Sequence, residues 1–371
     1  MRQLKKIIIF YPNMERGGVI NNLVNITNFL SSYYQINLIS DANNIKIYKF
    51  NENIKLIKIK DTETTSHLFY KFFSTVKACY ILFLHLRKLD ATDTIVFSFQ
   101  SHVLSILVSK FLNFKIIIRN SEDVMQSTKF SNNYLKAILI ILLKYFFYNF
   151  TTKIITNSKQ SFNSLKSIVY NKKKILLIYN PYLNKIYKVS EKNKRQNIIL
   201  NIGRFCKQKN QFQLIDTFNK FTKIYAEYKL FLVGGGSVKK KLLEYIKHKK
   251  LEKKIFLKEW SDDLRKYYLK SKFFVLSSLY EGLPNVIIDS INFELPVVST
   301  AVSGTKDILL GKKGGYISKV NNVDSLFLAM QRCHNNYNIA KKKTLYAKKF
   351  LHRFLIKTQN KKYLELFKNI K

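Results

Sequence analysis

The chain has 371 residues, and 65 Lys or Arg against 23 Asp or Glu give it a formal net charge of +42. The length suits two domains, and the 47% share of hydrophobic residues excludes a disordered polycation. The three cysteines, Cys79, Cys206 and Cys333, have neither the spacing of a disulfide framework nor that of a zinc site, so a reducing compartment is expected. Basic residues dominate both halves of the chain, which favours a general compositional bias over one dedicated binding stripe.

The first half alternates short apolar runs with segments of helical length. A glycine pair, Gly17-Gly18, follows the first apolar run and precedes a helical pattern over 19–31. Alternation of this kind predicts a parallel sheet covered by helices on both faces. The polar, proline-containing stretch 180–197 is the expected linker. The expected strands are 6–11, 35–40, 54–59, 94–99, 115–118 and 153–156.

The second half repeats the scheme and ends in a basic helical pattern over 339–371. Its expected strands are 197–202, 229–233, 255–257, 273–277 and 296–300. The chain is thus predicted to form two doubly wound Rossmann-like α/β domains that face a central cleft, with ligands beyond the carboxyl ends of the strands. The expected boundaries are 1–185, 186–345 and a terminal basic helix, 346–371, that packs back on the first domain.

The most specific stretch is SSLYEGLPNVIID at 277–289. Glu281 and Gly282 lie in the loop after a strand, and Pro284 suits the first turn of the next helix. Amides at Gly282, Leu283 and the helix start would point at an anion, while the Glu281 carboxylate would accept hydrogen bonds from neutral hydroxyls. Asp289, two turns on, is placed to bind a second diol. An ordinary turn followed by a solvated Asp289 is the alternative interpretation.

A second constellation is NIGRFCKQKN at 201–210. Gly203 ends a strand and permits close approach of the backbone, and Arg204 and Lys209 supply a planar fork and a flexible charge suited to two phosphates. In a chain this rich in lysine, a single Lys is weak evidence, and Arg204 directly after the glycine is stronger evidence.

Together these stretches resemble the retaining two-domain glycosyltransferases of the GT-B fold, specifically glycosyltransferase family 4. The signals occur in the family's order: the Gly17-Gly18 loop, NIGR-x4-K at 201–209, VGGG at 233–236, SSLYEGLPNVIID, PVVST at 296–300 and VSGTKDIL at 302–309. The resemblance is strong over 197–325 and thinner but colinear over 1–180.

The resemblance implies roles for individual residues. The family's two-acid motif falls on Glu281, which would hold sugar hydroxyls, and on Asp289, which would hold the nucleotide ribose. Arg204 and Lys209 would neutralise the donor diphosphate, which is the leaving group. The list of donor-binding positions is completed by Gly18, Gly203, Gly282, Leu283 and Pro284. Family members use a nucleoside-diphosphate sugar as co-substrate, need neither cofactor nor metal, and retain the anomeric configuration.

Four positions depart from the family pattern and put the fine donor geometry in doubt. Asp289 is one methylene shorter than the usual glutamate, Glu294 stands where a glycine is common, and Asp307 replaces a frequent glutamate. The stretch after Gly18, Val19-Ile20-Asn21, lacks the acidic residue that many members carry.

In the first half, SFQSH-x16-RNSED at 98–123 resembles a subgroup that builds surface polysaccharides such as lipopolysaccharide, O-antigen or capsule and often transfers N-acetylhexosamines. His102 would contact the donor or act as a weak general base, and an ordinary helix-start histidine is the alternative. Arg119 would bind an acidic acceptor. Glu281 and His102 are therefore the expected catalytic residues.

Two basic, apolar and aromatic segments, 68–89 and 135–150, are too short or too charged to span a bilayer and suit a helix lying in a membrane interface. A helix buried against the sheet is the alternative. The resemblance favours a cytoplasmic protein attached peripherally to the inner, anionic face of the cytoplasmic membrane, with a lipid-linked glycan as acceptor. The rival functions are a basic nucleic-acid-binding protein, for which no known module is present, and a catalytically silent scaffold of the same fold.

Overall fold

The computed structural model describes residues 4–13, 18–41, 49–59, 68–131, 133–190, 194–261 and 263–370. The chain forms two compact units. The first unit consists of Met1–Val124, Ser131–Tyr182 and Phe354–Lys371, and the second of Met125–Phe130 and Leu183–Arg353. The chain thus passes between the units three residues before the expected boundary at 185, and it leaves the second unit eight residues after the expected end at 345.

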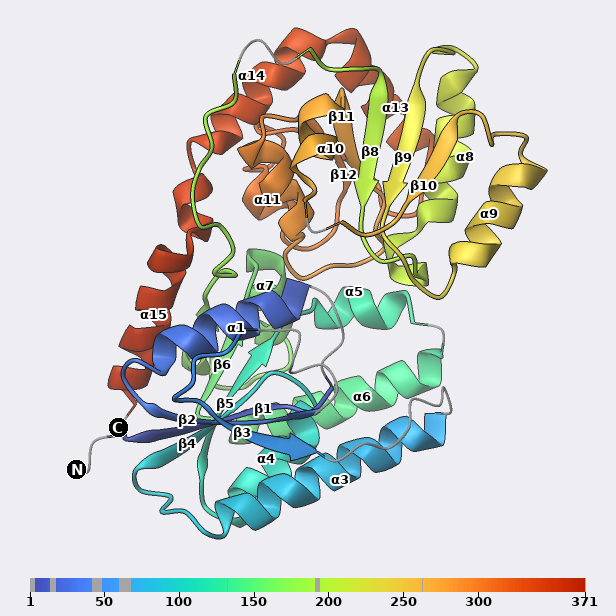
Figure 1. Cartoon of the computed structure of the whole chain (residues 1–371). Helices are drawn as coiled ribbons and strands as arrows, with labels where there is room; N and C mark the ends of the chain where they lie inside the picture. The colour runs from blue at the N-terminus through green and yellow to red at the C-terminus, as the bar shows by residue number, and fades with distance from the viewer. Residues whose placement is uncertain are drawn as a thin grey trace. The chain divides into compact units, whose positions relative to one another are not determined.

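The first unit holds a seven-stranded parallel sheet with the order β3-β2-β1-β4-β5-β6-β7 (Figure 1). Six of these strands were predicted, and the three-residue β7 was not. The strands are β1 (Lys6–Tyr11), β2 (Gln35–Asp41), β3 (Lys55–Ile59), β4 (Thr94–Ser98), β5 (Lys115–Asn120), β6 (Lys153–Thr156) and β7 (Ile175–Leu177).

Helices cover both faces of this sheet. Successive residues of β1 point to opposite faces, so each face of the strand packs against a different layer of helices. Ile7 and Ile9 pack among residues of α1 (Gly18–Leu30) and α15 (Ile356–Lys368). Ile8 and Phe10 pack among residues of the helices on the other face. Those helices are α3 (Leu68–Leu86), α4 (His102–Phe111), α6 (Tyr134–Phe147) and α7 (Lys159–Lys166), with short 3-10 turns at η1 (Tyr148–Phe150) and η2 (Lys172–Lys174).

The end of the chain is two helices rather than the single one that the basic pattern indicates. α14 (Tyr337–Lys348) is followed by the 3-10 turn η4 (Leu351–Phe354) and then by α15. On the first sheet the Phe97 ring lies 6.1 Å from the Tyr363 ring and 5.4 Å from the Phe367 ring. α15 therefore completes the core of the first unit beside α1 (Figure 1).

The second unit holds a six-stranded parallel sheet with the order β10-β9-β8-β11-β12-β13, the Rossmann order. The direction of the strand order reverses between β8 and β11, where ligands of such sheets bind. The strands are β8 (Ile198–Ile202), β9 (Lys229–Val233), β10 (Ile255–Lys258), β11 (Phe273–Leu276), β12 (Val297–Thr300) and β13 (Tyr316–Ser318). The doubly wound α/β class predicted for both domains is confirmed.

The helices of this unit also lie on two faces (Figure 1). α8 (Gln211–Thr222), α9 (Lys239–His248) and α13 (Val323–Asn335) enclose the main apolar core. α10 (Arg265–Lys270) and α11 (Asn285–Asn292) lie on the other face, and the short α12 (Thr305–Ile308) follows β12. The six-residue α5 (Val124–Lys129) lies almost entirely in the second unit.

Arg195 fixes the ends of α10 and α11. Its Nη1 donates to the carbonyls of Tyr268 at 2.7 Å and Ser271 at 2.9 Å, and its Nη2 to those of Phe293 at 2.8 Å and Glu294 at 3.1 Å. Burial lowers the pKa of this guanidinium. Carbonyls at the ends of helices carry partial negative charge, so a cation here stabilises both helices.

Candidate active site

The candidate active site lies at the carboxyl edge of the second sheet. Gly203 follows β8, and the loop Ser277–Glu281 follows β11. Because β8 and β11 are neighbours in the sheet, the loops that leave them meet. The residues singled out from two separate stretches of the sequence, 201–210 and 277–289, are thereby brought together.

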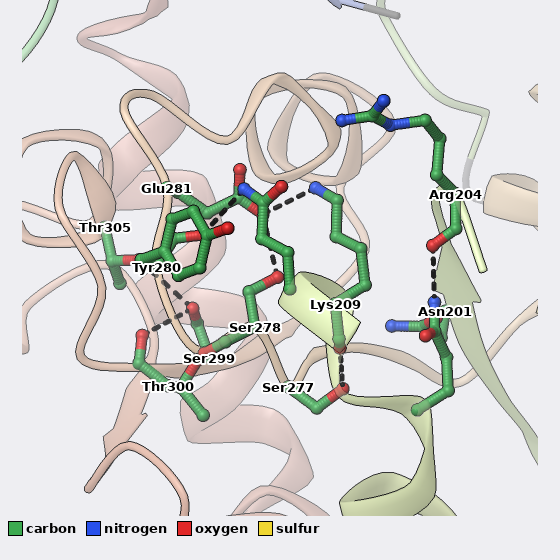
Figure 2. Close-up of polar contacts among 12 residues, drawn as sticks. Asn201, Arg204, Lys209, Ser277, Ser278, Tyr280, Glu281, Ser299, Thr300 and Thr305 are labelled. Atoms are coloured by element: carbon green, nitrogen blue, oxygen red, sulfur yellow. Dashed lines mark hydrogen bonds and ion pairs between the residues drawn. The ribbon is translucent and has the colours of Figure 1, made fainter. Parts of the chain in front are cut away.

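An ion pair joins the two loops (Figure 2). Lys209 Nζ lies 2.5 Å from Glu281 Oε1, and the side chains are only 16% and 10% exposed. Ser278 Oγ donates to the same oxygen at 2.7 Å. Both contacts use Oε1, and within the described chain Oε2 has no hydrogen-bond partner. The carboxylate is therefore held by one oxygen and can accept from a ligand with the other.

Backbone contacts fix the loops that carry this pair. Gln208 Nε2 donates to the Tyr280 carbonyl at 2.9 Å, and Leu279 N donates to the Gln208 carbonyl at 2.8 Å. Ser277 Oγ donates to the Lys209 carbonyl at 2.9 Å. These bonds hold the ammonium and the carboxylate in register before any ligand arrives.

Arg204 belongs to the same edge. Its side chain is exposed, while its carbonyl accepts a hydrogen bond from Gln211 Nε2 at 2.9 Å. Figure 2 shows the Arg204 and Lys209 side chains extending in the same direction from their loop. Two cations at this edge suit an anionic ligand such as a diphosphate.

Two glycines are required by close packing of these loops. A Cβ on Gly234, whose φ is +150°, would collide with the Gly203 carbonyl. A Cβ on Gly304, whose φ is +76°, would lie 2.6 Å from the Gly282 carbonyl. The glycines of the VGGG and VSGT motifs thus allow their loops to pack directly against the NIGR and EGLP loops.

The EGLP loop leads into α11. Pro284 precedes the helix, which begins at Asn285, whereas the sequence placed the proline in the first turn. Gly282, Leu283 and Pro284 are buried. Asp289 lies in the middle of α11 and is partly exposed, and Tyr268 Oη donates to its Oδ2 at 3.4 Å. Asp289 is thus fixed beside α10.

The departure at Glu294 has a structural explanation. Glu294 has a φ of +56°, in the left-handed region that favours glycine, which accounts for the glycine common at this position. Lys348 Nζ lies 2.6 Å from Glu294 Oε1 and also donates to the Tyr187 carbonyl at 2.5 Å. This chain therefore uses the side chain at a position where a glycine would be less strained.

His102 lies in the first unit, at the start of α4 and just beyond β4. Its Nδ1 is 3.2 Å from Ser98 Oγ. Burial lowers the pKa of His102 to about 3, with a further lowering by the positive charge of Lys144. The imidazole is therefore neutral at pH 7, which suits a hydrogen-bonding group better than a general base.

Arg119 occupies the core of the first unit. The side chain is fully buried, with Nε donating to Tyr363 Oη at 3.0 Å, Nη1 to Ser121 Oγ at 2.6 Å and Nη2 to Asn180 Oδ1 at 2.5 Å. It joins β5 to α15 and to the segment after β7. The acceptor contact expected of Arg119 stays a prediction, and this burial counts against it.

Gly18 begins α1, beyond the carboxyl end of β1. Gly17 lies outside the described residues. The donor contact expected of Gly18 stays a prediction.

Three supporting side chains, Ser277, Ser278 and Gln208, were not singled out in the sequence. The Ser-Ser pair at a strand end is a weak signal for hydroxyls near a carboxylate, and nothing in the sequence pointed to Gln208.

Among the described residues no group of three or more His, Cys, Asp or Glu is gathered to hold a metal ion. Within those same ranges no helix has the length and apolar character needed to cross a bilayer.

Comparisons with known proteins agree with the resemblance. Residues 184–350 match the family model described as "Glycosyl transferases group 1". The match covers most of the second unit, and this part of the chain is similar to the group 1 glycosyltransferases. The resemblance inferred from the motifs is confirmed, as are the GT-B fold and the enzyme class.

Two relatives and one solved structure illustrate the match. An uncharacterized glycosyltransferase of Methanocaldococcus jannaschii is 34% identical over 46% of this chain, and the match spans 45% of that protein, less than half its length. The N-acetylgalactosamine-N,N'-diacetylbacillosaminyl-diphospho-undecaprenol 4-alpha-N-acetylgalactosaminyltransferase of Campylobacter jejuni is 28% identical over 66% of this chain and 67% of its own. The crystal structure of Anabaena HepE with UDP-glucose has a TM-score of 0.79 at 15% identity and covers 98% of this chain and 100% of that one, a likeness of fold.

These findings favour a glycosyltransferase over the nucleic-acid-binding protein that the composition left open. Group 1 glycosyltransferases are enzymes of the sugar-transfer class, and the +42 charge does not by itself mark a nucleic-acid-binding protein.

Proposed function

We propose that this glycosyltransferase transfers a sugar, an N-acetylhexosamine, from a nucleoside-diphosphate donor to a lipid-linked, growing surface glycan with retention of configuration. The observation that carries the proposal is the Lys209–Glu281 pair beside Arg204 at the switch point of the second sheet. These three residues lie in adjacent loops and supply a carboxylate for sugar hydroxyls and two cations for a diphosphate.

The two cations have a role in bond breaking. As the bond between the sugar and the diphosphate lengthens, negative charge grows on the departing nucleotide, and preplaced positive charge stabilises it. Lys209 gives one of its three N–H donors to Glu281 and keeps the others for phosphate oxygens. Arg204 supplies a planar fork for the same group. No step of this description requires a metal ion.

Glu281 and Asp289 divide the rest of the donor between them. Glu281 accepts from sugar hydroxyls with Oε2, since Oε1 is already bonded to Lys209 and Ser278. Asp289 accepts from the ribose hydroxyls, and Tyr268 holds its carboxylate from the other side.

The choice of sugar and acceptor rests on relatives. The Campylobacter jejuni relative is named for transfer of N-acetylgalactosamine to an undecaprenol-diphosphate-linked glycan. An acceptor of this chemistry resides in a membrane, so the proposal implies attachment of the protein to the bilayer, at the cytoplasmic face.

The first unit presents a surface suited to that attachment. Helix α6 exposes apolar side chains along most of its length, among them Leu135 at 80% and Phe146 at 61%. Phe111 at the end of the neighbouring α4 is 77% exposed. This many exposed apolar side chains on neighbouring helices is uncommon on a protein that stays in water. The membrane-facing surface, as we define it, comprises Tyr80, Leu84, Leu107, Phe111, Leu135, Leu139, Ile140, Leu142, Leu143, Tyr145, Phe146 and Phe150.

Lysines adjoin this surface at the end of α6. Lys174 Nζ donates to the Asn149 carbonyl at 2.8 Å, and Lys153 Nζ donates to the Lys173 carbonyl at 3.3 Å. Desolvation lowers the pKa of Lys174, and the positive charges of Lys110 and Lys153 lower it further. Apolar side chains beside a concentration of positive charge are what an anionic lipid surface attracts, at about 1 kcal/mol per lysine.

Transfer itself is tested with undecaprenyl-diphosphate-linked glycans and a panel of nucleotide sugars, with release of nucleoside diphosphate as the readout. The proposal expects one sugar nucleotide to be consumed by the wild type and not by Glu281→Ala. Equal turnover by both proteins, or none by either across the panel, contradicts it. The second outcome is the one expected of a silent scaffold.

Membrane attachment is tested by flotation with anionic vesicles at low and high salt. The wild type is expected to float at low salt, and Leu139→Glu/Phe146→Glu is expected to remain in solution. Leu243→Glu, an exposed apolar residue on α9 of the second unit, serves as the matched control and should float. A wild type that stays wholly unbound contradicts the attachment.

A further inference from the structure

Gln126, in α5, uses its side-chain amide to hold the loop that follows β12. Its Nε2 donates to the Ala301 carbonyl at 3.4 Å, and its Oε1 accepts from Ser303 N at 3.2 Å. The amide is therefore both donor and acceptor to the backbone of one short loop. We call residues 300–305 the VSGT loop. It is held by a side chain from another element of the second unit.

Gln126 comes from a distant part of the sequence. It precedes Ala301 by 175 residues. It lies in Met125–Phe130, a segment that belongs to the second unit although the chain before and after it belongs to the first. The side chain is half-buried. A residue from the first half of the chain thus takes part in the structure of the ligand edge of the second sheet.

The VSGT loop in turn supports the EGLP loop, which carries Glu281. Thr300 Oγ1 donates to the Ser278 carbonyl at 2.7 Å, and both residues are buried (Figure 2). Gly304 packs so closely that a Cβ on it would lie 2.6 Å from the Gly282 carbonyl. The two loops therefore touch on both sides of Glu281, and in such close packing a shift of one loop displaces the other.

The contact extends from the EGLP loop to the carboxylate of Glu281. Ser278, whose carbonyl is held by Thr300, donates from its Oγ to Glu281 Oε1 at 2.7 Å. The other oxygen, Oε2, is the one assigned to sugar hydroxyls, so its direction depends on where Ser278 lies. Misplacement of a reacting group by about 1 Å is enough to lower a rate by about 100-fold.

We propose that Gln126 is a positioning residue of the donor site: it holds the VSGT loop, and that loop holds Glu281 in the orientation that binds the sugar. The inference rests on the proposed function, because it takes Glu281 to bind the sugar of the donor. Gln126 acts through the loop and needs no contact with the substrate.

Hydrogen exchange tests the coupling of the loops without a measurement of activity. Gln126→Met keeps the length of the side chain and removes both hydrogen bonds, and Lys129→Ala, at an exposed position of the same helix, is the matched control. In Gln126→Met the amides of 299–305 should exchange about 2- to 10-fold faster, the factor expected for one lost hydrogen bond, and those of 277–284 should follow. The control should exchange like the wild type. Faster exchange confined to 299–305, or no change at all, overturns the proposal.

Kinetics separate positioning from a merely structural role. Gln126→Met should lower kcat about 10- to 100-fold and raise KM for the sugar nucleotide by less than about 3-fold, because the diphosphate still binds while the sugar is no longer aligned. Affinity for the nucleoside diphosphate, which has no sugar, should be unchanged. Thr300→Val should give the same pattern, and the double variant should lose less than the product of the two single effects, since both act through the same loop.

The outcomes distinguish this inference from the proposed function. A wild-type kcat in folded Gln126→Met overturns the role of Gln126 and leaves the proposed function standing. Equal weakening of sugar-nucleotide and nucleoside-diphosphate binding also overturns it, since that pattern shows general damage to the second unit. A wild type that consumes no sugar nucleotide overturns both.

Discussion

Substitutions in the Lys209–Glu281 pair should change the stability of the second unit and the rate of sugar transfer to different extents. The two side chains meet at 2.5 Å with 16% and 10% exposure. We consider Lys209→Met, Glu281→Gln and the double variant. Methionine has nearly the length of lysine without the charge, and glutamine keeps the shape of glutamate and its acceptor for Ser278.

The expected free energies follow from burial and charge. Removing one partner of a buried ion pair leaves an uncompensated charge and costs about 3–5 kcal/mol when the pair is fully enclosed. Partial exposure of this pair reduces that to about 2–4 kcal/mol for Lys209→Met, which strands a carboxylate, and to about 1–3 kcal/mol for Glu281→Gln, whose amide still accepts from Lys209. The double variant contains no stranded charge, so its loss should be about 0–2 kcal/mol, well below the sum of the single losses.

Urea unfolding followed by tryptophan emission measures these values. Trp260 is the single tryptophan and lies in the second unit, so its emission reports unfolding of the unit that contains the pair. Sugar transfer is measured on the same samples. All three variants should lose about 100-fold or more of their turnover, because removing one preplaced charge from a reacting site has that effect.

Recovered stability without recovered activity is therefore the expected behaviour of the double variant. Additive losses of stability would refute the pairing, since they would show that the two side chains do not interact in solution. Wild-type turnover in the double variant would refute their role in catalysis.

Three further predictions concern other parts of the molecule. Gly234→Ala should destabilise the second unit by about 2 kcal/mol or more, because its Cβ collides with the Gly203 carbonyl, whereas Gly235→Ala, with open space around it, should be close to neutral in the same urea assay; equal effects would contradict the packing. Glu294→Gly should be about 1 kcal/mol more stable than Glu294→Ala, since both lose the Lys348 contact and only alanine keeps the left-handed strain; a more stable alanine variant would disprove this. The His102 imidazole should show no NMR titration midpoint between pH 5 and 8, and because its folded pKa is lowered, its contribution to stability is present above about pH 6.5 and is lost as the pH falls toward 3, by at most about 1.4 kcal/mol per pH unit; a midpoint near 6.5 would show that the ring is not desolvated.

The parallel architecture and the positions of Gly203, Lys209 and Glu281 in loops after strands were predictable because they depend on local patterns, whereas the ion pair between Lys209 and Glu281 was not predicted. Strand-length apolar runs in β1 and β8 indicate their structure directly, and strand-ending glycine and acid residues mark the ligand edge. β7 and β13 were missed because three residues are too few to show a pattern.

Long-range contacts were beyond the reach of the sequence. Arg119 carries the same charge as Arg204 and also follows apolar strand residues, yet its partners Asn180 and Tyr363 lie 61 and 244 residues away and bury it completely. In the sequence Glu294 is only a departure from a motif. Its contact with Lys348 could not be predicted because Lys348 lies 54 residues further on. The structural role of such residues depends on which distant side chain contacts them.

The central claim is that Arg204, Lys209 and Glu281 form the site at which a nucleotide sugar is cleaved and its sugar transferred. Its most direct test is nucleoside-diphosphate release from the panel of sugar nucleotides with undecaprenyl-diphosphate-linked acceptors, comparing the wild type with Glu281→Gln. We expect acceptor-dependent release by the wild type and a loss of about 100-fold or more in the variant, without unfolding of the second unit. Equal release by the two folded proteins would contradict it.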